Sequence, residues 1–496
     1  MPLTLNAQQQ LLYDKIVSQS FGKMLVLGEG GSGKTFTLCA AMSELARRGT
    51  NNMVLCAPTH LARLNIHKKL DIDVAHLIET VTVASLLQKF GIQRDDGTVQ
   101  FTSGKLDKVN KYSIVVLDEC SMISEEDYML FMVSKAKVIF LGDFSQLPPV
   151  MAKSAEGKVK THTGTGNLEV ITLTQQMRQQ GVIHAAAERN RKAAWFPEES
   201  ETGEGGERII VHDTDRDMVD RMVAEILSDF RGYDATYHHR YIAYKNETVR
   251  KVGKSVRDRV LDKYFGFDAR SIPFIPREII MMRENKGSIG YNGELVEVVS
   301  VKKDTRSHKY PWTSYELTVK GSLGTGLIRT LPPCEFDIMT DYVNGLQGKL
   351  RRHQIAGEPA SASAVLSEIK RIKSQWTMTQ YPYAISTHKS QGSTIENVYL
   401  NTLSFVRAPN RRALLYVGIS RASHNLHAIR VPGTMQLQRS EVNAAYRKAR
   451  AAYEDVAGES YRKVVRYLGV PTGSLEGKRT VTEYLEFLIE ELKQNG

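Results

Sequence analysis

The first 180 residues alternate short apolar runs with longer segments of helical character. A short apolar run bounded by turn residues is typical of a buried strand, and buried strands separated by helices are typical of a parallel sheet covered on both faces. The pattern therefore predicts an α/β domain over residues 1–180. Its predicted strands are Met24–Leu27, Met53–Ala57, Ser113–Asp118, Lys137–Gly142 and Leu168–Leu173.

A second alternating region begins near Ile209, is interrupted, and then resumes near Tyr383. Because both parts share the strand-and-helix pattern, the sequence predicts a second parallel sheet assembled from residues 181–265 and 378–435. Its predicted strands include Tyr241–Tyr244 before the interruption and Tyr383–Ser386, Asn397–Leu400 and Leu426–Arg430 after it.

The interruption, residues 266–377, has a different character. Residues 267–331 contain β-rich runs punctuated by glycines, a pattern typical of a small inserted barrel. Residues 360–375 are helical and basic, and Trp376 follows them. The final segment, 436–496, predicts a C-terminal helical extension.

A shorter insertion at residues 91–110 interrupts the first region. It contains the turn sequence Asp95-Asp96-Gly97-Thr98, which predicts a hairpin, and Phe101 follows that turn. An aromatic residue at such a tip either caps a small local core or stacks against a base, and the sequence leaves both readings open.

The most specific stretch lies between the first predicted strand and a helical run from Phe36 to Ala46. Glycines let successive N–H groups converge on phosphate oxygens, and a helix N-terminus adds positive partial charge. In this context the pattern G-x-x-x-x-G-K-[ST] predicts a nucleotide site, with Lys34 reaching the outer phosphates and Thr35 binding Mg²⁺. The residues of this phosphate loop are Gly28, Glu29, Gly30, Gly31, Ser32, Gly33, Lys34 and Thr35.

Polar residues follow the next predicted strands. Asp118 and Glu119 end one strand, where a buried carboxylate is costly unless it meets a metal or a hydrogen-bond network. Beside a phosphate loop, Asp118 is expected to hold Mg²⁺ and Glu119 to orient the attacking water. Gln146 follows another strand and is a candidate sensor of the γ-phosphate, linked to whatever Pro148 touches.

An arginine that stabilises a transferring phosphate must approach from outside the loop that holds the phosphate. Arg178, after the last strand of the first region, and Arg421, in the second region, are the candidates. If both reach the nucleotide, it lies in a cleft between two α/β domains, and its cleavage changes their separation.

The charge and cysteine content of the chain indicate which binding partners and which cell compartment to expect. Lys and Arg exceed Asp and Glu by 66 to 55, a formal net charge of +11, which suits a polyanion and favours nucleic acid over a membrane. The four cysteines lack metal-binding spacing and predict buried thiols in a reducing compartment. We found no leader-like or membrane-spanning run and expect a cytoplasmic protein, or one in the host cytoplasm if the protein is viral.

These motifs occur in one order: GEGGSGKT, APTH, DECSM, GDFSQLPP, QQMRQ, STHKSQGST and YVGISRA. The ordered set resembles the superfamily 1 DNA helicases of the RecD/Dda branch. The resemblance implies two RecA-like domains, a pin-like insertion in the first and an SH3-like barrel in the second. It also implies ATP- and Mg²⁺-dependent 5′-to-3′ translocation on single-stranded DNA, unwinding of forked DNA, a monomer, and replication or recombination proteins as partners.

The resemblance also assigns residues. Gln9 resembles an adenine-reading glutamine, and Lys34, Thr35, Asp118, Glu119, Gln146, Arg178 and Arg421 resemble the ATPase set. The residues expected to contact nucleic acid are Thr59, His60, Phe101, Pro148, Asn246, Trp376, Thr387 and His388. Relatives often carry a T-x-H-S element where this chain has Thr82-Val83-Ala84-Ser85, so the usual histidine contact is missing.

Two other functions remain open from the sequence. One is a single-strand translocase that displaces bound proteins with little unwinding, and the other is a nucleotide-gated nucleic-acid-binding switch.

Overall fold

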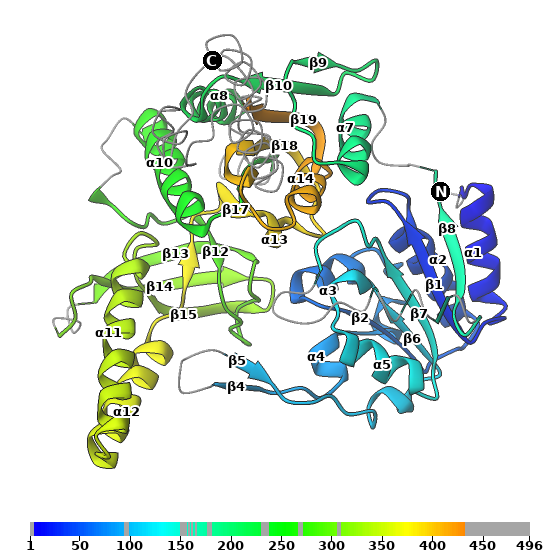
Figure 1. Cartoon of the computed structure of the whole chain (residues 1–496), viewed down its shortest axis with the longest axis horizontal. Helices are drawn as coiled ribbons and strands as arrows, with labels where there is room; N and C mark the ends of the chain where they lie inside the picture. The colour runs from blue at the N-terminus through cyan, green and yellow to red at the C-terminus, as the bar shows by residue number, and fades with distance from the viewer. Residues whose placement is uncertain are drawn as a thin grey trace, which may run out of the picture.

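The computed structural model describes residues 4–93, 99–148, 156, 159, 162–163, 166–175, 181–229, 238–265, 271–304 and 309–431. These ranges contain two mainly parallel six-stranded sheets, one antiparallel sheet and a two-stranded hairpin. Figure 1 shows the two parallel sheets side by side, with the antiparallel sheet below the second one. Arg178, the turn at 95–98 and the predicted extension at 436–496 lie outside the described residues.

The first lobe, defined here as residues 4–175, is built on a parallel sheet with the order β3-β2-β6-β7-β1-β8. Its central strand β1 pairs with β7 and β8, so that Met24 lies between Ile139 and Glu169. The five predicted strands are confirmed. The bounds are α1 Ala7–Val17, β1 Lys23–Gly28, α2 Lys34–Arg47, β2 Met53–Ala57, α3 His60–His67, β3 Glu79–Thr82, α4 Val83–Leu86, β6 Ile114–Leu117, α5 Glu125–Val133, β7 Lys137–Gly142 and β8 Glu169–Leu173.

Hydrophobic side chains cover both faces of this sheet. Leu12 of α1 and Met42 of α2 pack with Val26 on one face, while Phe131 of α5 packs with Phe140 on the other. β3 was not predicted, because its sequence Glu-Thr-Val-Thr is neither apolar nor long. The sheet thus places the phosphate loop at the carboxyl end of a strand that is fixed from both sides.

The second lobe, defined here as residues 181–265 and 381–431, has the sheet order β17-β11-β18-β19-β10-β9. Its strands come from two separate parts of the chain, because β11 pairs with β17 on one side and β18 on the other. The bounds are α7 Gly181–Lys192, β9 Glu201–Thr202, β10 Arg208–His212, α8 Asp215–Ser228, β11 His239–Ala243, α10 Asn246–Phe265, β17 Ala384–Ser386, α13 Thr387–Ser390, β18 Ile395–Leu400, α14 Arg411–Ile419 and β19 Ala422–Ile429.

The insert, defined here as residues 271–380, contains the antiparallel sheet β15-β14-β13-β12-β16 and two helices. The Thr377 N–H donates to the Arg329 carbonyl at 2.7 Å, and the hydroxyls of Thr330 and Thr379 lie 3.1 Å apart. The two edge strands of the sheet therefore meet. The bounds are β12 Ile279–Met282, β13 Leu295–Asp304, β14 Ser314–Gly321, β15 Gly324–Thr330, α11 Phe336–Ile355, α12 Pro359–Gln375 and β16 Thr379–Gln380.

The predicted hairpin is present as β4 Gly91–Gln93 paired with β5 Val99–Phe101. It projects from the first lobe on the side of the insert (Figure 1). Short 3₁₀ turns occur at Ala75–Leu77, Val109–Lys111, Cys120–Met122 and Thr402–Phe405. None of the helices in the described ranges is both long and apolar enough to cross a membrane. Cys39, Cys56 and Cys120 are buried as predicted, whereas Cys334 is exposed.

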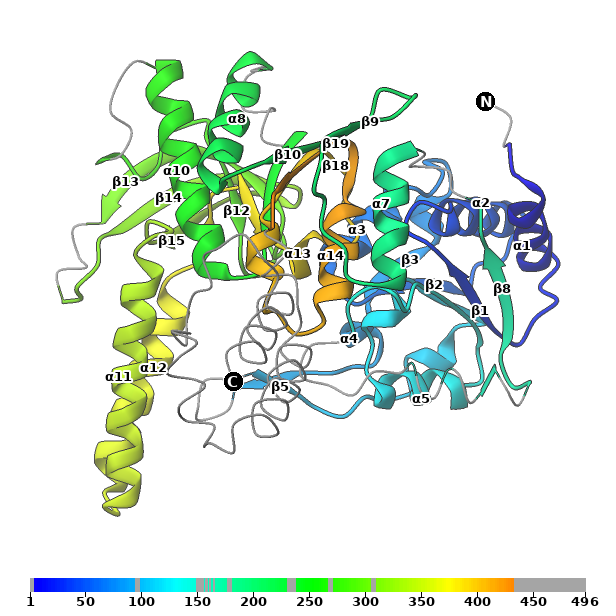
Figure 2. The ribbon, with the colours of Figure 1, turned by 45° about the horizontal axis from the view of Figure 1, so that its top comes forward.

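Figure 2 shows α14 and α7 of the second lobe turned toward the first lobe. The two helices pack on each other through Ile183, Ala187 and Leu414, so they act as one surface. This surface faces the phosphate loop.

Candidate active site

Three neighbouring strands of the first lobe end at one edge of the sheet. The phosphate loop follows β1, Asp118 follows β6, and Asp143 follows β7. Because parallel strands share a carboxyl edge, the sheet gathers side chains that lie far apart in the sequence. This edge is where the sequence analysis expected the nucleotide.

The backbone of the phosphate loop requires glycine at two clear positions. Gly33 has a φ of 83° at the N-terminus of α2, in the left-handed region. A Cβ on Gly28 would lie 2.5 Å from Ser32 Oγ and 2.8 Å from the Leu173 carbonyl, so the loop leaves no room for one there. The ammonium group of Lys34 donates to the carbonyls of Gly28 at 2.7 Å and Glu29 at 2.8 Å.

The predicted Mg²⁺ ligands lie together. Thr35 Oγ1 donates to Asp118 Oδ2 at 3.0 Å, and Asp118 is 8% exposed. A hydroxyl and a carboxylate are the oxygen ligands that Mg²⁺ takes in proteins, so the residues fit this ion. Burial lowers the pKa of Lys34, and the negative charges of Asp143 and Glu119 oppose that effect.

Glu119 has an unusual backbone and an unusual carboxyl group. Its φ is 53°, a left-handed value that costs a non-glycine residue about 1–3 kcal/mol and often marks a functional position. Burial raises the pKa of its carboxyl group, and the Asp118 carboxylate adds to that effect. A carboxyl group with a raised pKa is suited to accept a proton from water.

Arg421 and Tyr416 of the second lobe both reach the phosphate loop. A Cβ on Gly30 would lie 3.5 Å from Arg421 Nη2, so the guanidinium lies directly beside the loop. The Tyr416 hydroxyl donates to Asp143 Oδ2 at 2.6 Å and accepts from the Gly30 N–H at 3.5 Å. Arg421 is 3% exposed, and its Nε donates to the Val417 carbonyl at 3.1 Å. The predicted approach of Arg421 to the loop is therefore present.

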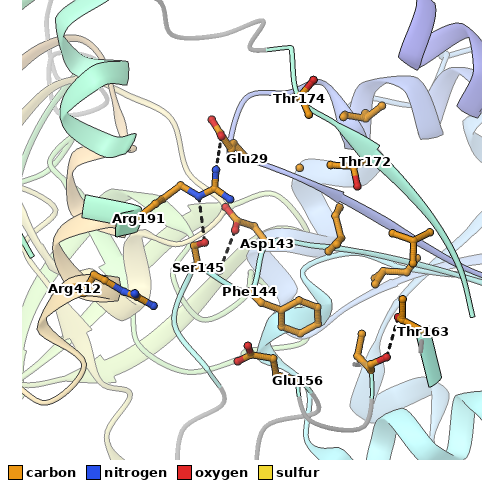
Figure 3. A pocket seen from close by; sticks show the side chains of 16 residues that line it. Glu29, Asp143, Phe144, Ser145, Glu156, Thr163, Thr172, Thr174, Arg191 and Arg412 are labelled. Atoms are coloured by element: carbon orange, nitrogen blue, oxygen red, sulfur yellow. Dashed lines mark hydrogen bonds and ion pairs between the residues drawn. The ribbon is translucent and has the colours of Figure 1, made fainter. Parts of the chain in front are cut away.

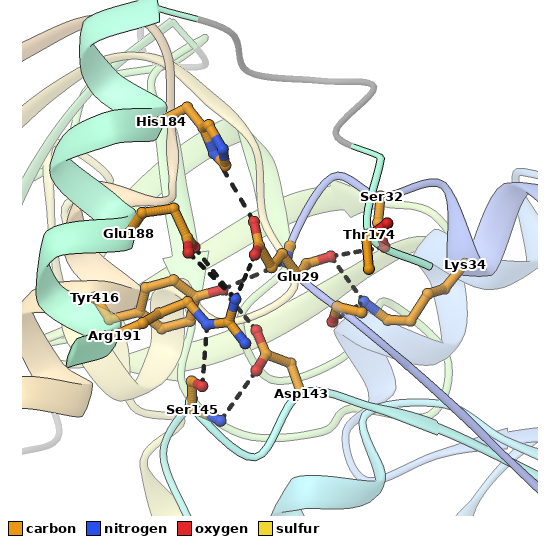
Figure 4. Close-up of polar contacts among 12 residues, drawn as sticks. Glu29, Ser32, Lys34, Asp143, Ser145, Thr174, His184, Glu188, Arg191 and Tyr416 are labelled. Carbon is orange, nitrogen blue, oxygen red and sulfur yellow. Dashed lines mark hydrogen bonds and ion pairs between the residues drawn. The ribbon is translucent and has the colours of Figure 1, made fainter. Parts of the chain in front are cut away.

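Figure 4 shows a further cluster around Glu29 of the loop, which was not predicted from the sequence. Arg191 of α7 forms an ion pair with Glu29, and its Nε donates to Ser145 Oγ at 3.2 Å. His184 and Glu188 lie on the same face of α7 as Arg191. His184 is four residues before Glu188, and Glu188 is three residues before Arg191, which is the spacing of neighbours along one helix face. The sequence shows that they share a face but not what this face meets.

A cavity of about 700 Å³ opens beside this cluster (Figure 3). Its inner wall is apolar and includes Leu25, Leu27 and Val170, while Glu29 and Arg191 also line it. The cavity therefore begins at the phosphate loop and runs along one face of β1 and β8.

The two glutamines lie near the loop but differ in availability. The Nε2 of Gln9 donates to the Ser32 carbonyl at 3.3 Å and its Oε1 accepts from the Asn6 N–H at 3.1 Å, with the residue 1% exposed. Its amide thus supports the loop, and its reading of an adenine base stays a prediction. Gln146 is 5% exposed, and its Oε1 has no hydrogen-bond partner within the described ranges.

His60, one of the residues expected to contact nucleic acid, lies where the first lobe meets the insert. The ring of His60 stacks on Tyr291 of the insert, with centroids 4.4 Å apart, and the guanidinium of Arg63 lies 4.7 Å from the same ring. Lys389 lies 3.4 Å from Asn292 Oδ1. The sequence analysis missed Tyr291, which no motif marks.

The other residues of this group divide into accessible and inaccessible ones. Thr59 is exposed and caps α3 by accepting from the Ala62 N–H, and Asn246 is exposed at the start of α10. Pro148 and His388 are half-buried. Thr387 is fully buried, and its hydroxyl donates to the Ala243 carbonyl at 3.4 Å, so it shapes the turn after β17.

Trp376 requires a correction. It is 1% exposed and packs edge to face on Trp312 in the core between the antiparallel sheet and the helices α11 and α12. An aromatic ring at the end of a basic helix can stack on a nucleic-acid base or pack in a hydrophobic core, and here it packs in the core. Phe101 lies in β5 by its backbone, and its side chain is outside what the structure describes.

Comparison with known proteins adds independent findings. Residues 4–204 match the model of an AAA domain, and residues 381–429 match that of a UvrD-like helicase C-terminal domain. The ATP-dependent DNA helicase Dda of enterobacteria phage T4 is 20% identical over 450 residues, which is 83% of this chain and 95% of Dda. The uncharacterized protein R530 of Acanthamoeba polyphaga mimivirus is 36% identical over 168 residues, and the match spans 33% of that protein's length.

Among solved structures, Pif1 helicase from Bacteroides in complex with ADP-AlF3 and ssDNA aligns with 92% of this chain and 99% of its own, at 17% identity and a TM-score of 0.48. The AAA match covers the first lobe and the start of the second, and the UvrD-like match covers the end of the second lobe. The two family matches and the similarity to Dda support a resemblance of the chain to superfamily 1 helicases of the RecD/Dda-like branch.

Proposed function

We propose that this protein is an ATP-driven DNA helicase that moves 5′-to-3′ along single-stranded DNA and unwinds forked duplexes. The observation that carries the proposal is the contact of Arg421 and Tyr416 of the second lobe with the phosphate loop of the first. A nucleotide in this loop is then held by both lobes, so hydrolysis changes the contacts between them. The name of Dda, an ATP-dependent DNA helicase, supports DNA and ATP as the substrates.

Each residue of the site has a role in this mechanism. Lys34 and the N–H groups of the loop bind and orient the outer phosphates, and Thr35 and Asp118 hold Mg²⁺. When bound, Mg²⁺ neutralises phosphate charge. Glu119 orients the attacking water and accepts its proton, and Gln146 senses the γ-phosphate. Arg421 stabilises charge that develops on the transferring phosphoryl group, with Arg178 as a second arginine.

The strand path follows from the same proposal. Thr59 and His60 of the first lobe and His388 of the second contact the DNA backbone, with the half-buried Lys389 beside them. Burial lowers the pKa of Lys389 to about 7, and an anionic phosphate nearby would favour its charged form. We assign the β4–β5 hairpin as the pin that meets the duplex and the insert as an SH3-like domain, whose meeting edge strands support that assignment.

The direct test uses duplexes with matched 5′ or 3′ single-stranded tails, each in DNA and RNA versions. Unwinding of the 5′-tailed DNA at a rate at least about tenfold above that of the other three is the expected result, because a motor that tracks one strand in one direction needs that strand loaded first. Strand separation is measured by gel or by loss of fluorescence quenching. Equal unwinding of both tails contradicts the direction, and streptavidin displacement without unwinding favours the translocase alternative.

Removal of the Tyr416 hydroxyl tests the contact between the lobes. We expect Tyr416→Phe to lower DNA-stimulated ATP hydrolysis by about three- to tenfold, because the ring keeps its packing but the bonds to Asp143 and Gly30 are lost. Steady-state hydrolysis with and without single-stranded DNA is the measurement. Tyr399→Phe, which removes another buried hydroxyl of the second lobe away from the phosphate loop, is the matched control. An equal loss in both variants would show a general packing effect.

A further inference from the structure

The phosphate loop carries a negative charge of its own. Glu29 is its second residue, and its side chain is 18% exposed and faces the second lobe. A loop that binds anions through N–H groups and a lysine loses affinity when a carboxylate stands beside them. The position of Glu29 therefore needs an explanation other than direct phosphate binding.

The second lobe supplies the charge that compensates Glu29. Arg191 Nη1 donates to a Glu29 carboxylate oxygen and lies 3.3 Å from Glu188 Oε1, while Arg191 Nε donates to Ser145 Oγ at 3.2 Å. His184 Nδ1 lies 3.9 Å from Glu29 Oε2. Arg191 thus joins α7 of the second lobe to two loops of the first, one after β1 and one after β7 (Figure 4).

We propose that Glu29 is an electrostatic brake on nucleotide binding and that Arg191 releases this brake when the two lobes come together. In the first lobe alone, the Glu29 carboxylate repels the phosphates. With α7 in place, the Arg191 guanidinium cancels that charge, and the loop binds the nucleotide more tightly. Because coupling between two binding events is reciprocal, nucleotide binding then favours the closed arrangement of the lobes. The inference rests on the proposed function only in taking a nucleotide as the ligand.

The surroundings of Glu29 give the idea a pH dependence. The groups that face its carboxylate are Arg191, His184 and Glu188 from α7 and Asp143 from the loop after β7. On either side of it, the Tyr416 hydroxyl of α14 accepts from the Gly30 N–H, and the Lys34 ammonium group donates to the Glu29 backbone carbonyl. Burial raises the pKa of Glu29 to about 7; Arg191 opposes this and Glu188 adds to it. With the lobes together, the Glu29 carboxylate is therefore protonated progressively as the pH falls through about 7, which removes the negative charge that Arg191 otherwise cancels.

The experiment measures binding directly, without turnover. A fluorescent ADP with a methylanthraniloyl group is titrated with Mg²⁺ into the full chain and into Glu29→Gln, Arg191→Gln and the double variant, at pH 6 and pH 8. At pH 8 we expect Kd to fall about three- to tenfold in Glu29→Gln and to rise about tenfold in Arg191→Gln. The double variant should return to within about threefold of Glu29→Gln, and the effect of Glu29→Gln should shrink at pH 6.

Glu44→Gln is the matched control, since it removes the same charge about 15 Å along α2 from the loop and should leave Kd unchanged. Unchanged or weaker binding by Glu29→Gln overturns the inference, and so does a double variant as weak as Arg191→Gln. If Arg191→Gln does not fold, the brake is still tested by comparing the change in Kd between pH 6 and pH 8 in the wild-type chain with the same change in Glu29→Gln. A failure of DNA to stimulate hydrolysis would remove the proposed function and leave these binding results standing.

Discussion

Replacement of Lys34 by alanine is expected to abolish ATP hydrolysis and duplex unwinding while single-strand binding persists. The Lys34 ammonium group spans its own loop and is the cation that the loop offers to phosphate oxygens. Loss of one preorganised charge of this kind costs at least about 10²- to 10³-fold in kcat. Steady-state hydrolysis with saturating single-stranded DNA measures the first effect, and fluorescence anisotropy of a labelled strand measures the binding that should remain.

Lys15→Ala is the matched control for that variant. Lys15 lies in the same lobe and pairs with Glu169 at the start of β8, at the other end of the strand from the phosphate loop. It should hydrolyse ATP at the wild-type rate. Unwinding retained by Lys34→Ala would contradict the assignment of the loop as the hydrolytic site.

Arg421→Ala is expected to have the second large effect on ATP hydrolysis. We expect kcat for DNA-stimulated hydrolysis to fall by about 10³-fold or more with a small change in KM, because the guanidinium acts on charge that appears only in the transition state. The substitution also removes the bonds to the Val417 and Ser393 carbonyls, so a loss of about 1–3 kcal/mol in unfolding free energy is expected. Single-turnover hydrolysis and thermal unfolding separate the two effects.

The control for Arg421 is Arg430→Ala, at the far end of β19, where the side chain pairs with Asp213 at 3.0 Å and is 50% exposed. It should change neither rate nor stability appreciably, because exposed pairs contribute about 0–1 kcal/mol. If Arg421→Ala keeps its rate while losing stability, Arg421 supports the fold alone, and the account of two lobes acting on one phosphate fails.

The sequence predicted the buried central strands of both parallel sheets because fully buried strands need continuous apolar runs, as in Lys137–Gly142. It did not predict the two-residue edge strand β9. It also predicted the phosphate loop and Asp118, because the chemistry fixes residue types at short spacing. β3 was not predicted, because its own sequence is not hydrophobic and it becomes a strand only by pairing with β2 in the sheet.

The contacts between the lobes could not be predicted in the same way. Tyr416 and Asp143 are 273 residues apart, and Arg191 and Glu29 are 162 apart. No local pattern specifies such partners, because they depend on how two separately folded sheets meet. Trp376 shows the opposite error, since a resemblance suggested contact with nucleic acid where the packing with Trp312 makes the ring part of a core.

The split origin of the second sheet has a consequence for synthesis of the protein. Tyr241 of β11 sits between Ala384 and Tyr399, so the strand that emerges from the ribosome first waits for neighbours about 140 residues later. At about 5–20 residues per second this delay lasts roughly 7–30 seconds. During this delay the strand His239–Ala243, whose five residues are buried in the folded protein, has no partner strand on either edge. We therefore expect nascent chains of this length to bind chaperones.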